Sequence, residues 1–229
     1  MEPLYIIPAR GGSKGIPHKN IRPLAGRPLI HYSIAAALEA GAHPDHILVS
    51  TDDPAIAACA REAGIDVPFM RPAELATDTA GSREVILHAM EQADALGIDY
   101  DCVVLLQPTS PLRTSGDIRA ALDIYRHADR PDMVVSVTEA AANPYYDCFE
   151  TDPSTGLLHV SKGDGLITRR QDAPAAWQYN GAIYVIRPES IRAMPMGRFP
   201  RRIPYPMPRE RSIDIDTPMD WLVAQELMK

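Results

Sequence analysis

Short apolar runs alternate along the chain with longer segments in which apolar residues recur at helical spacing. The runs predict strands at residues 3–9, 46–50, 101–107 and 132–138, with a weaker one at 66–70. The longer segments predict helices at residues 27–41, 53–64, 82–97 and 114–128, the last opening with a capping box of Thr114 and Asp117. This alternation indicates βαβ units and a mainly parallel α/β sheet with right-handed crossovers.

The alternation breaks after residue 138. The stretch from about 140 to 178 is rich in turns and contains only short alternating pieces. A strand at residues 181–188 and a closing helix at residues 218–228 then resume the pattern. The sequence therefore predicts one domain over residues 1–229 that carries an insertion at about 140–178.

The composition is ordinary for a globular chain, with an acidic balance. A formal net charge of -7 over 229 residues argues against non-specific nucleic-acid binding, which needs a broad basic surface. No apolar run approaches the ~20 residues needed to cross a bilayer, and no signal-peptide pattern opens the chain, so no membrane partner is expected. Cys59, Cys102 and Cys148 lack metal-ligand spacing, so reduced thiols and a cytoplasmic location are expected.

One basic loop interrupts this acidic background. Residues 9–20, ARGGSKGIPHKN, follow the first predicted strand, and their glycines have neither Walker A nor GxGxxG spacing. Glycines still let backbone N–H groups turn inward around an anion, and Arg10, Lys14 and Lys19 can neutralise phosphates. A solvated surface loop is the alternative. Because ligands of open α/β sheets bind beyond the carboxyl ends of the strands, this position favours a phosphate site.

Five blocks of sequence together resemble one family. They are ARGGSKGIPHKNI (residues 9–21), STDD (50–53), RPAELATDTAGS (71–82), LLQPTSPLR (105–113), and RRQDAPAAWQYNGAIYV (169–185) with SIDIDT (212–217). In this order they resemble the CMP-sialic acid synthetases, also called acylneuraminate cytidylyltransferases. The resemblance implies a Rossmann-like, three-layer α/β/α nucleotidyltransferase fold whose insertion serves dimerisation and reaches the partner's active site.

The same resemblance implies an activity. The expected reaction transfers CMP from CTP to the anomeric hydroxyl of a nonulosonic acid, a nine-carbon keto sugar acid, and releases pyrophosphate. Mg²⁺ is the implied cofactor and a homodimer the implied assembly. The substrate stays open between N-acetylneuraminate, legionaminate, pseudaminate, the deaminated sugar and the eight-carbon acid KDO. One reason is that Tyr145 and Tyr146 stand where some sialate-specific relatives have a lysine.

The resemblance also assigns site residues. Those expected to act in catalysis are Arg10, Lys19 and Asp216. Those expected to bind the nucleotide are Arg10, Gly11, Gly12, Ser13, Lys14, Lys19, Asn20, Arg71, Asp78, Thr79 and Ser82. Those expected to bind the sugar acid are Gln107, Thr109, Ser110, Arg170, Asn180 and Tyr184. Plainer interpretations stay open for some of them, such as a helix N-cap for Ser82 and a core position for Tyr184.

Asp214 and Asp216 are the expected metal ligands. They alternate with isoleucines, and on an extended segment residues two apart point to the same face. Two carboxylates on one face can hold Mg²⁺, which prefers oxygen ligands and bridges phosphates. The alternative from the pattern alone is the polar outer face of an edge strand; the resemblance favours the metal pair.

Two other classes of function compete with the enzyme. A nucleotide-sugar binding protein without turnover would be free to lose residues such as Arg10, Lys19, Asp214 and Asp216, which are all present. A nicotinamide-dependent dehydrogenase is disfavoured because the chain lacks the GxGxxG fingerprint.

Overall fold

The computed structural model describes residues 1–77 and 79–229, so the predicted nucleotide-binding residue Asp78 lies outside the described residues. A six-stranded sheet, with strand order β10-β6-β9-β5-β1-β4, forms the centre of the molecule. Its strands are β1 (Pro3–Pro8), β4 (Ile47–Ser50), β5 (Cys102–Leu105), β6 (Met133–Glu139), β9 (Trp177–Ile186) and β10 (Arg202–Pro206). Strand β9 is antiparallel to β5 and β6, and the other pairings are parallel. The prediction of a mainly parallel sheet is confirmed.

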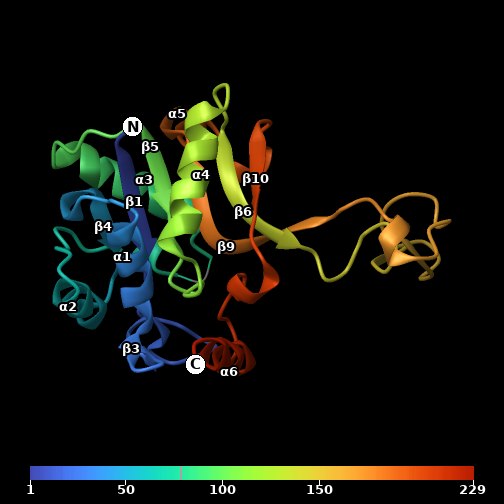
Figure 1. Ribbon diagram of the computed structural model, residues 1–229, viewed down its shortest axis with the longest axis horizontal. Coiled ribbons are helices and arrows are strands. Elements are labelled where there is room, and N and C mark those ends of the chain that lie inside the picture. The colour runs from blue at the N-terminus through green and yellow to red at the C-terminus, as the bar shows by residue number, and fades with distance from the viewer. Residues whose placement is uncertain (78) are drawn as a thin grey trace.

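Helices cover both faces of this sheet and make three layers (Figure 1). They are α1 (Leu29–Glu39), α2 (Pro54–Glu62), α3 (Ser82–Ala95), α4 (Ser115–His127), α5 (Pro188–Ala193) and α6 (Pro218–Leu227). In β1, Tyr5 and Ile7 belong to the core shared with α1, α2 and α4, whereas Leu4 and Ile6 belong to the core shared with α3 and α5. Burial on both faces explains why the central strands are continuous apolar runs.

The helix starts test two sequence predictions. Helix α4 begins with the predicted capping box, in which Thr114 Oγ1 accepts from the Asp117 amide at 3.2 Å and Asp117 Oδ2 accepts from the Thr114 amide at 2.9 Å. The N-cap interpretation of Ser82 is wrong, because Gly81 occupies the N-cap of α3 and Ser82 is the first helical residue. The Ser82 hydroxyl is therefore not used to start the helix.

The sheet differs from the prediction at two places. Residues 66–70 form no strand; Val67 is buried in the core, and its carbonyl accepts from Arg61 Nη2 at 3.1 Å. Strand β10 is not among the predicted strands, because Pro204 and Pro206 interrupt its alternation; prolines at this density are typical of loops and edge strands. The structure accommodates both prolines because β10 lies at the sheet edge and pairs with β6.

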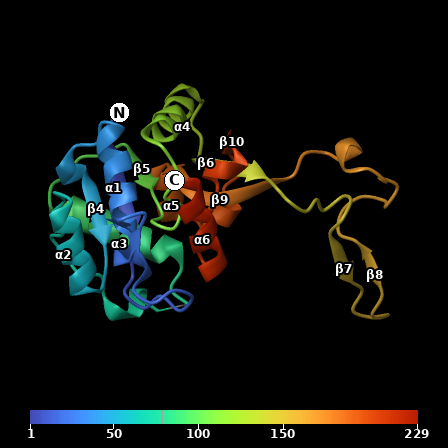
Figure 2. The same cartoon turned by 60° about the horizontal axis from the view of Figure 1, so that its bottom comes forward.

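Residues 140–176, which we call the arm, leave the sheet after β6 and extend away from it (Figures 1 and 2). The arm contains the antiparallel hairpin of β7 (Phe149–Thr151) and β8 (Leu158–Val160). Several of its large apolar side chains face solvent, including Phe149 at 57%, Leu158 at 70% and Leu166 at 78% exposure. None of the helices in the described ranges is both long and apolar enough to cross a membrane.

Candidate active site

A cavity of about 460 Å³ lies at the carboxyl ends of the central strands, lined by Pro8 of β1 and Leu105 of β5. We define two segments that meet there: the first loop, residues 9–20, and the C-terminal segment, residues 208–216. The predicted site residues that line the cavity are Arg10, Ser13, Lys19, Asn20, Arg71, Ser82, Gln107, Thr109, Asp214 and Asp216. Residues that lie far apart in the sequence therefore share one cavity.

Two hydrogen bonds fix the shape of the first loop. The Gly11 amide donates to Asp52 Oδ1 at 3.0 Å, and Asn20 Nδ2 donates to the Arg10 carbonyl at 2.9 Å. Asn20 is buried, so its amide is an internal brace as well as part of the cavity wall. A loop held in this way before binding loses less conformational entropy when a ligand arrives.

Lys19 joins the first loop to the C-terminal segment. Its Nζ donates to the Ile215 carbonyl at 2.6 Å and lies 3.2 Å from Asp216 Oδ1. The Lys19 side chain is nearly enclosed, whereas that of Asp216 is 73% exposed, so screening by solvent leaves the ion pair with little effect on stability. Its consequence is geometric, because a cation and a carboxylate are held at fixed positions in one cavity.

Gly15 allows this close contact between the two segments. A Cβ added at Gly15 would lie 2.2 Å from the Asp216 carbonyl oxygen, far closer than any real contact of that kind. The two backbones therefore meet at a point where only glycine fits.

Ile215 sets the direction of the two aspartates that flank it. Its side chain is fully buried in a small core with Ile16 and Trp221, and its amide donates to the Thr109 carbonyl at 2.8 Å. Helix α6 starts just beyond, and the Asp216 amide donates to Asp220 Oδ2 at 3.1 Å. With Ile215 anchored inward, both aspartates face the cavity.

Asp214 is held in an environment that disfavours its charge. Desolvation raises the pKa of its carboxyl, and the negative charges of Asp216 and Asp220 raise it further, against the lowering effects of Thr109 and Lys19. A carboxylate in this position is stabilised by any cation that enters the cavity. Asp214 and Asp216 both offer carboxylate oxygens to the cavity, and such a pair suits a divalent metal ion.

Arg10 and Arg71 line the same cavity and bring positive charge to it. Arg71 is 6% exposed and donates from Nε to Ser50 Oγ at 3.0 Å and from Nη2 to the Ser50 carbonyl at 2.6 Å. Desolvation lowers its pKa to about 10; the charge of Arg10 lowers it too, while that of Asp52 raises it. Arg71 therefore keeps its charge at neutral pH, and the site gains electrostatically from an anion.

Arg113 donates to the backbone of the cavity residue Gln107, and the sequence does not predict it as a site residue. Its guanidinium is buried and donates from Nη1 to the Ala182 carbonyl at 2.6 Å and from Nη2 to the Gln107 carbonyl at 2.7 Å, with Ser33 Oγ as a further partner. Desolvation lowers its pKa to about 9, which the charges of Asp117 and Asp214 oppose. Its sequence signal is an arginine that closes the LLQPTSPLR block, just after the most apolar strand.

Gly181 keeps the wall beside Gln107 open. Its φ is +74°, and a Cβ there would lie 2.7 Å from Gln107 Oε1 and 3.3 Å from Asp214 Oδ2. Both the backbone angle and the missing side chain favour glycine. The polar atoms of Gln107 and Asp214 therefore approach the β9 backbone closely.

Four of the predicted sugar-binding residues do not line this cavity: Ser110, Arg170, Asn180 and Tyr184. Asn180 is buried, its Oδ1 accepts from Ser136 Oγ at 2.6 Å, and its Nδ2 donates to Ser212 Oγ at 2.9 Å. Tyr184 belongs to the core, where burial raises its pKa to about 12. Arg170 lies in the arm and donates to the Ala140 carbonyl at 2.9 Å.

The predicted nucleotide-binding residues divide in the same way. Ser82 lines the cavity from the first turn of α3, where the helix N-terminus favours an anion. Among the described residues, the predicted nucleotide-binding residues that do not line the cavity are Gly11, Gly12, Lys14 and Thr79.

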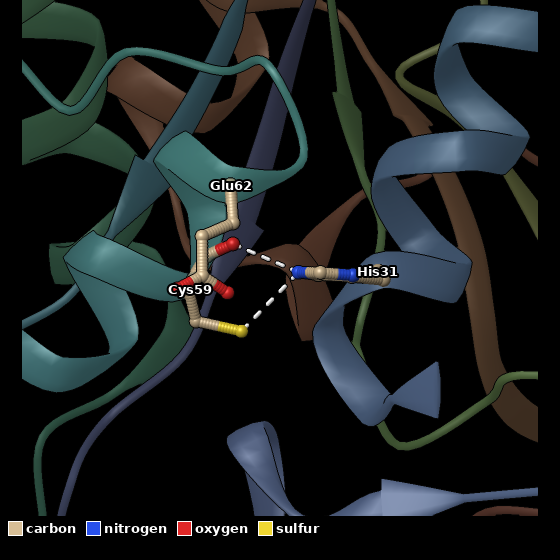
Figure 3. Close-up of side chains that lie close together, drawn as sticks. All are labelled: His31, Cys59 and Glu62. Atoms are coloured by element: carbon tan, nitrogen blue, oxygen red, sulfur yellow. Dashed lines mark hydrogen bonds between the residues drawn. The ribbon is translucent and has the colours of Figure 1, made fainter. Parts of the chain in front are cut away.

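A separate cluster of His31, Cys59 and Glu62 joins α1 to the end of α2 (Figure 3). Its nitrogen, sulfur and carboxylate ligand atoms all lie within 4.8 Å of one another. His31 Nε2 is 2.8 Å from the Cys59 carbonyl oxygen, which can only accept, so this nitrogen carries the hydrogen. Desolvation and then Glu62 raise the pKa of the Cys59 thiol, which disfavours the thiolate. The contact is therefore a cap on the C-terminal end of α2, and not a prepared metal site.

Comparison with known proteins gives a consistent family. A family model described as cytidylyltransferase matches residues 4–206. The CMP-N,N'-diacetyllegionaminic acid synthase of Legionella pneumophila is 35% identical, with 100% of this chain and 97% of that protein covered. The pseudaminic acid cytidylyltransferase of Campylobacter jejuni is 32% identical, with 100% and 97% covered.

The N-acylneuraminate cytidylyltransferase of Streptococcus agalactiae is 37% identical over 97% of this chain, which spans only 52% of that protein. Among solved structures, a CMP:2-keto-3-deoxy-manno-octonic acid synthetase complexed with CTP superimposes with a TM-score of 0.71 at 19% identity. It covers 100% of this chain and 98% of that chain, and it supports the three-layer nucleotidyltransferase fold.

Gly15→Ala is expected to lower the free energy of unfolding by about 1–3 kcal/mol, because its Cβ overlaps the Asp216 carbonyl and forces the two segments apart. Urea denaturation measures the change. Gly197→Ala is the matched control, since its Cβ would meet nothing within 4 Å. Equal stability of the two variants would contradict the close packing of the first loop on the C-terminal segment.

Asp214→Asn is expected to stabilise the protein at neutral pH. The raised pKa means that the folded state binds a proton more tightly than the unfolded state, so stability is lost as pH rises through this interval. The asparagine variant escapes this cost, and its advantage should disappear below about pH 4, where the aspartate is protonated. Thermal unfolding across pH measures the difference; a wild type more stable than the variant at neutral pH would contradict it.

Proposed function

The chain belongs to the cytidylyltransferase family, and we propose that it transfers CMP from CTP to the anomeric hydroxyl of a nonulosonic acid, releasing pyrophosphate. One observation carries this proposal: the basic first loop and the Asp214–Asp216 pair line the same cavity, joined by Lys19. Cationic groups and a carboxylate pair side by side suit a nucleoside triphosphate and its divalent cation.

The reaction joins two anions, so neutralising charge and aligning the reactants must supply most of the rate enhancement. The sugar oxygen forms a bond to the α-phosphorus of CTP, and the bond from that phosphorus to the oxygen bridging to the β-phosphate breaks, so that pyrophosphate leaves. The proton of the sugar hydroxyl passes to solvent. We assign the triphosphate to Arg10, Lys19, Arg71 and the N-terminus of α3 at Ser82. These groups favour the charge that develops on the departing pyrophosphate.

Asp214 and Asp216 fit Mg²⁺ as the cofactor. Both offer oxygen ligands to the cavity, and the raised pKa of Asp214 is the property that a nearby cation would relieve. When bound, Mg²⁺ supplies Lewis acidity and orientation at the phosphates. Lys19 fixes the backbone between the two aspartates, so these ligands are held before metal arrives.

We use the relatives to order the sugar acids to be tested. Proteins named for legionaminic and pseudaminic acids match this chain over nearly their whole length, whereas the N-acylneuraminate enzyme is about twice as long. We therefore take a legionaminic-type acid as the first substrate to test, with neuraminates and pseudaminate next. Gln107 and Thr109 are the cavity residues that we assign to the sugar acid.

We also propose that the arm mediates a homodimer. Phe149, Leu158 and Leu166 are exposed on a segment that extends from its own domain, so burying them needs another surface. A second copy of the chain is the partner that the family resemblance implies. An arm that crosses to the partner would also carry Arg170 toward the partner's cavity, where a guanidinium can grip a carboxylate.

Pyrophosphate release from CTP tests the activity. With Mg²⁺ present, we expect release with nine-carbon keto acids, fastest with the legionaminic type, and less with KDO. Asp216→Asn should lower turnover by about a hundredfold through loss of charge stabilisation, with an unchanged circular dichroism spectrum. If the protein binds CTP but releases no pyrophosphate with any of the sugar acids, a nucleotide-binding protein without turnover would be favoured instead.

Light scattering on a size-exclusion column tests the assembly. Leu158→Ser combined with Phe149→Ser should convert the dimer to a monomer, because both changes remove apolar area from the arm. Leu222→Ser is the matched control, since Leu222 is 60% exposed on α6 and outside the arm. A wild-type monomer at micromolar concentration would overturn the proposal.

A further inference from the structure

Asp117 has more partners than the start of α4 requires. Its Oδ2 completes the capping box with Thr114, and its Oδ1 accepts from Tyr205 Oη at 2.9 Å. Arg211 donates two hydrogen bonds to the same carboxylate, which we call the fork: Nη2 lies 2.9 Å from Oδ1 and Nε lies 3.2 Å from Oδ2. The Asp117 side chain is only 2% exposed, whereas that of Arg211 is 41% exposed.

A second helix of the same chain has a capping box that contains no arginine. Helix α6 starts with the same box, built from Thr217 and Asp220. Within the described residues no arginine donates to Asp220. The arginine on Asp117 therefore serves something other than the helix start.

Arg211 lies in the C-terminal segment, ahead of Asp214 and Asp216 in the sequence. It ends a 3-10 turn at Arg209–Arg211, three residues before Asp214. The next residue, Ser212, accepts from Asn180 Nδ2 at 2.9 Å. Further along, the Ile215 amide donates to Thr109 and its carbonyl accepts from Lys19.

The C-terminal segment is thus fixed at successive points to α4, β9 and the first loop. Asp117 is the point that also contacts Tyr205 of β10, so one buried carboxylate holds both the strand and the turn that follows it. A bidentate pair of this kind fixes direction as well as distance.

We propose that the Asp117–Arg211 pair positions the C-terminal segment so that Asp214 and Asp216 face the cavity, which makes Arg211 a positioning residue for the reaction. The inference rests on the proposed function for its catalytic meaning. Arg211 acts through the backbone of the segment and is not among the residues that line the cavity. Loss of the fork would free residues 208–213 to move and would loosen the Ile215 amide from Thr109.

Hydrogen exchange at the Ile215 amide tests this without requiring turnover. In Arg211→Met we expect exchange of this amide to accelerate by about tenfold, while exchange in α1 stays at the wild-type rate. Arg211→Lys, which keeps the charge but loses the fork, should fall between the two. Arg192→Met is the matched control, because Arg192 pairs with Asp94 at 3.0 Å away from the cavity.

A second measurement tests whether the position of the C-terminal segment affects metal binding. Mn²⁺ binding in the presence of CTP, followed by electron paramagnetic resonance, should weaken by about tenfold in Arg211→Met, while CTP binding without metal stays unchanged. Wild-type exchange at Ile215 in Arg211→Met would overturn the positioning role. If Arg211→Met does not fold, Tyr205→Phe and Arg211→Lys give the same comparison, and wild-type exchange in both would overturn it.

The two proposals fail separately. If the wild type neither binds CTP with Mn²⁺ nor releases pyrophosphate, the proposed function is wrong. In that case the exchange rate at Ile215 still decides whether Arg211 fixes the segment.

Discussion

The contact between Lys19 and the backbone at Ile215 is the interaction on which the site depends. It brings a loop that follows the first strand against a segment that precedes the last helix, and it does so with a hydrogen bond of 2.6 Å. Gly15 removes the side chain that would hold the two backbones apart, and Ile215 anchors its own segment in a small core. This contact holds the basic loop and the acidic pair at the same cavity.

The cavity contains buried groups of both signs, and burial disfavours the charge of each. Arg71 is kept charged although burial lowers its pKa, and Asp214 sits where burial raises its pKa. Each group costs the folded protein some stability, and each would be relieved by a ligand of opposite sign. A triphosphate that arrives with a divalent cation supplies both signs together, which explains how one cavity can hold such unlike groups.

The sequence predicts the parts of this structure that depend on local pattern. Continuous apolar runs identify β1 and β5, a threonine with an aspartate three residues later identifies the start of α4, and the motif blocks identify most of the residues that line the cavity. It does not predict β10, because the prolines that disguise this strand are harmless only at a sheet edge, and edge position is a tertiary property. The second role of Asp117 and the placement of Arg113 are hidden for the same reason, since their partners come from distant segments.

The reversed direction of β9 has a consequence for how the molecule can vary. Glu139 of β6 and Trp177 of β9 are paired residues on neighbouring antiparallel strands, so the arm leaves the sheet and returns to it at one residue pair. A loop whose two ends are a pair of facing residues can gain or lose residues without shifting the hydrogen-bond register of any strand. Changes in the length of the arm can therefore alter what it contacts without disturbing the sheet that positions the cavity.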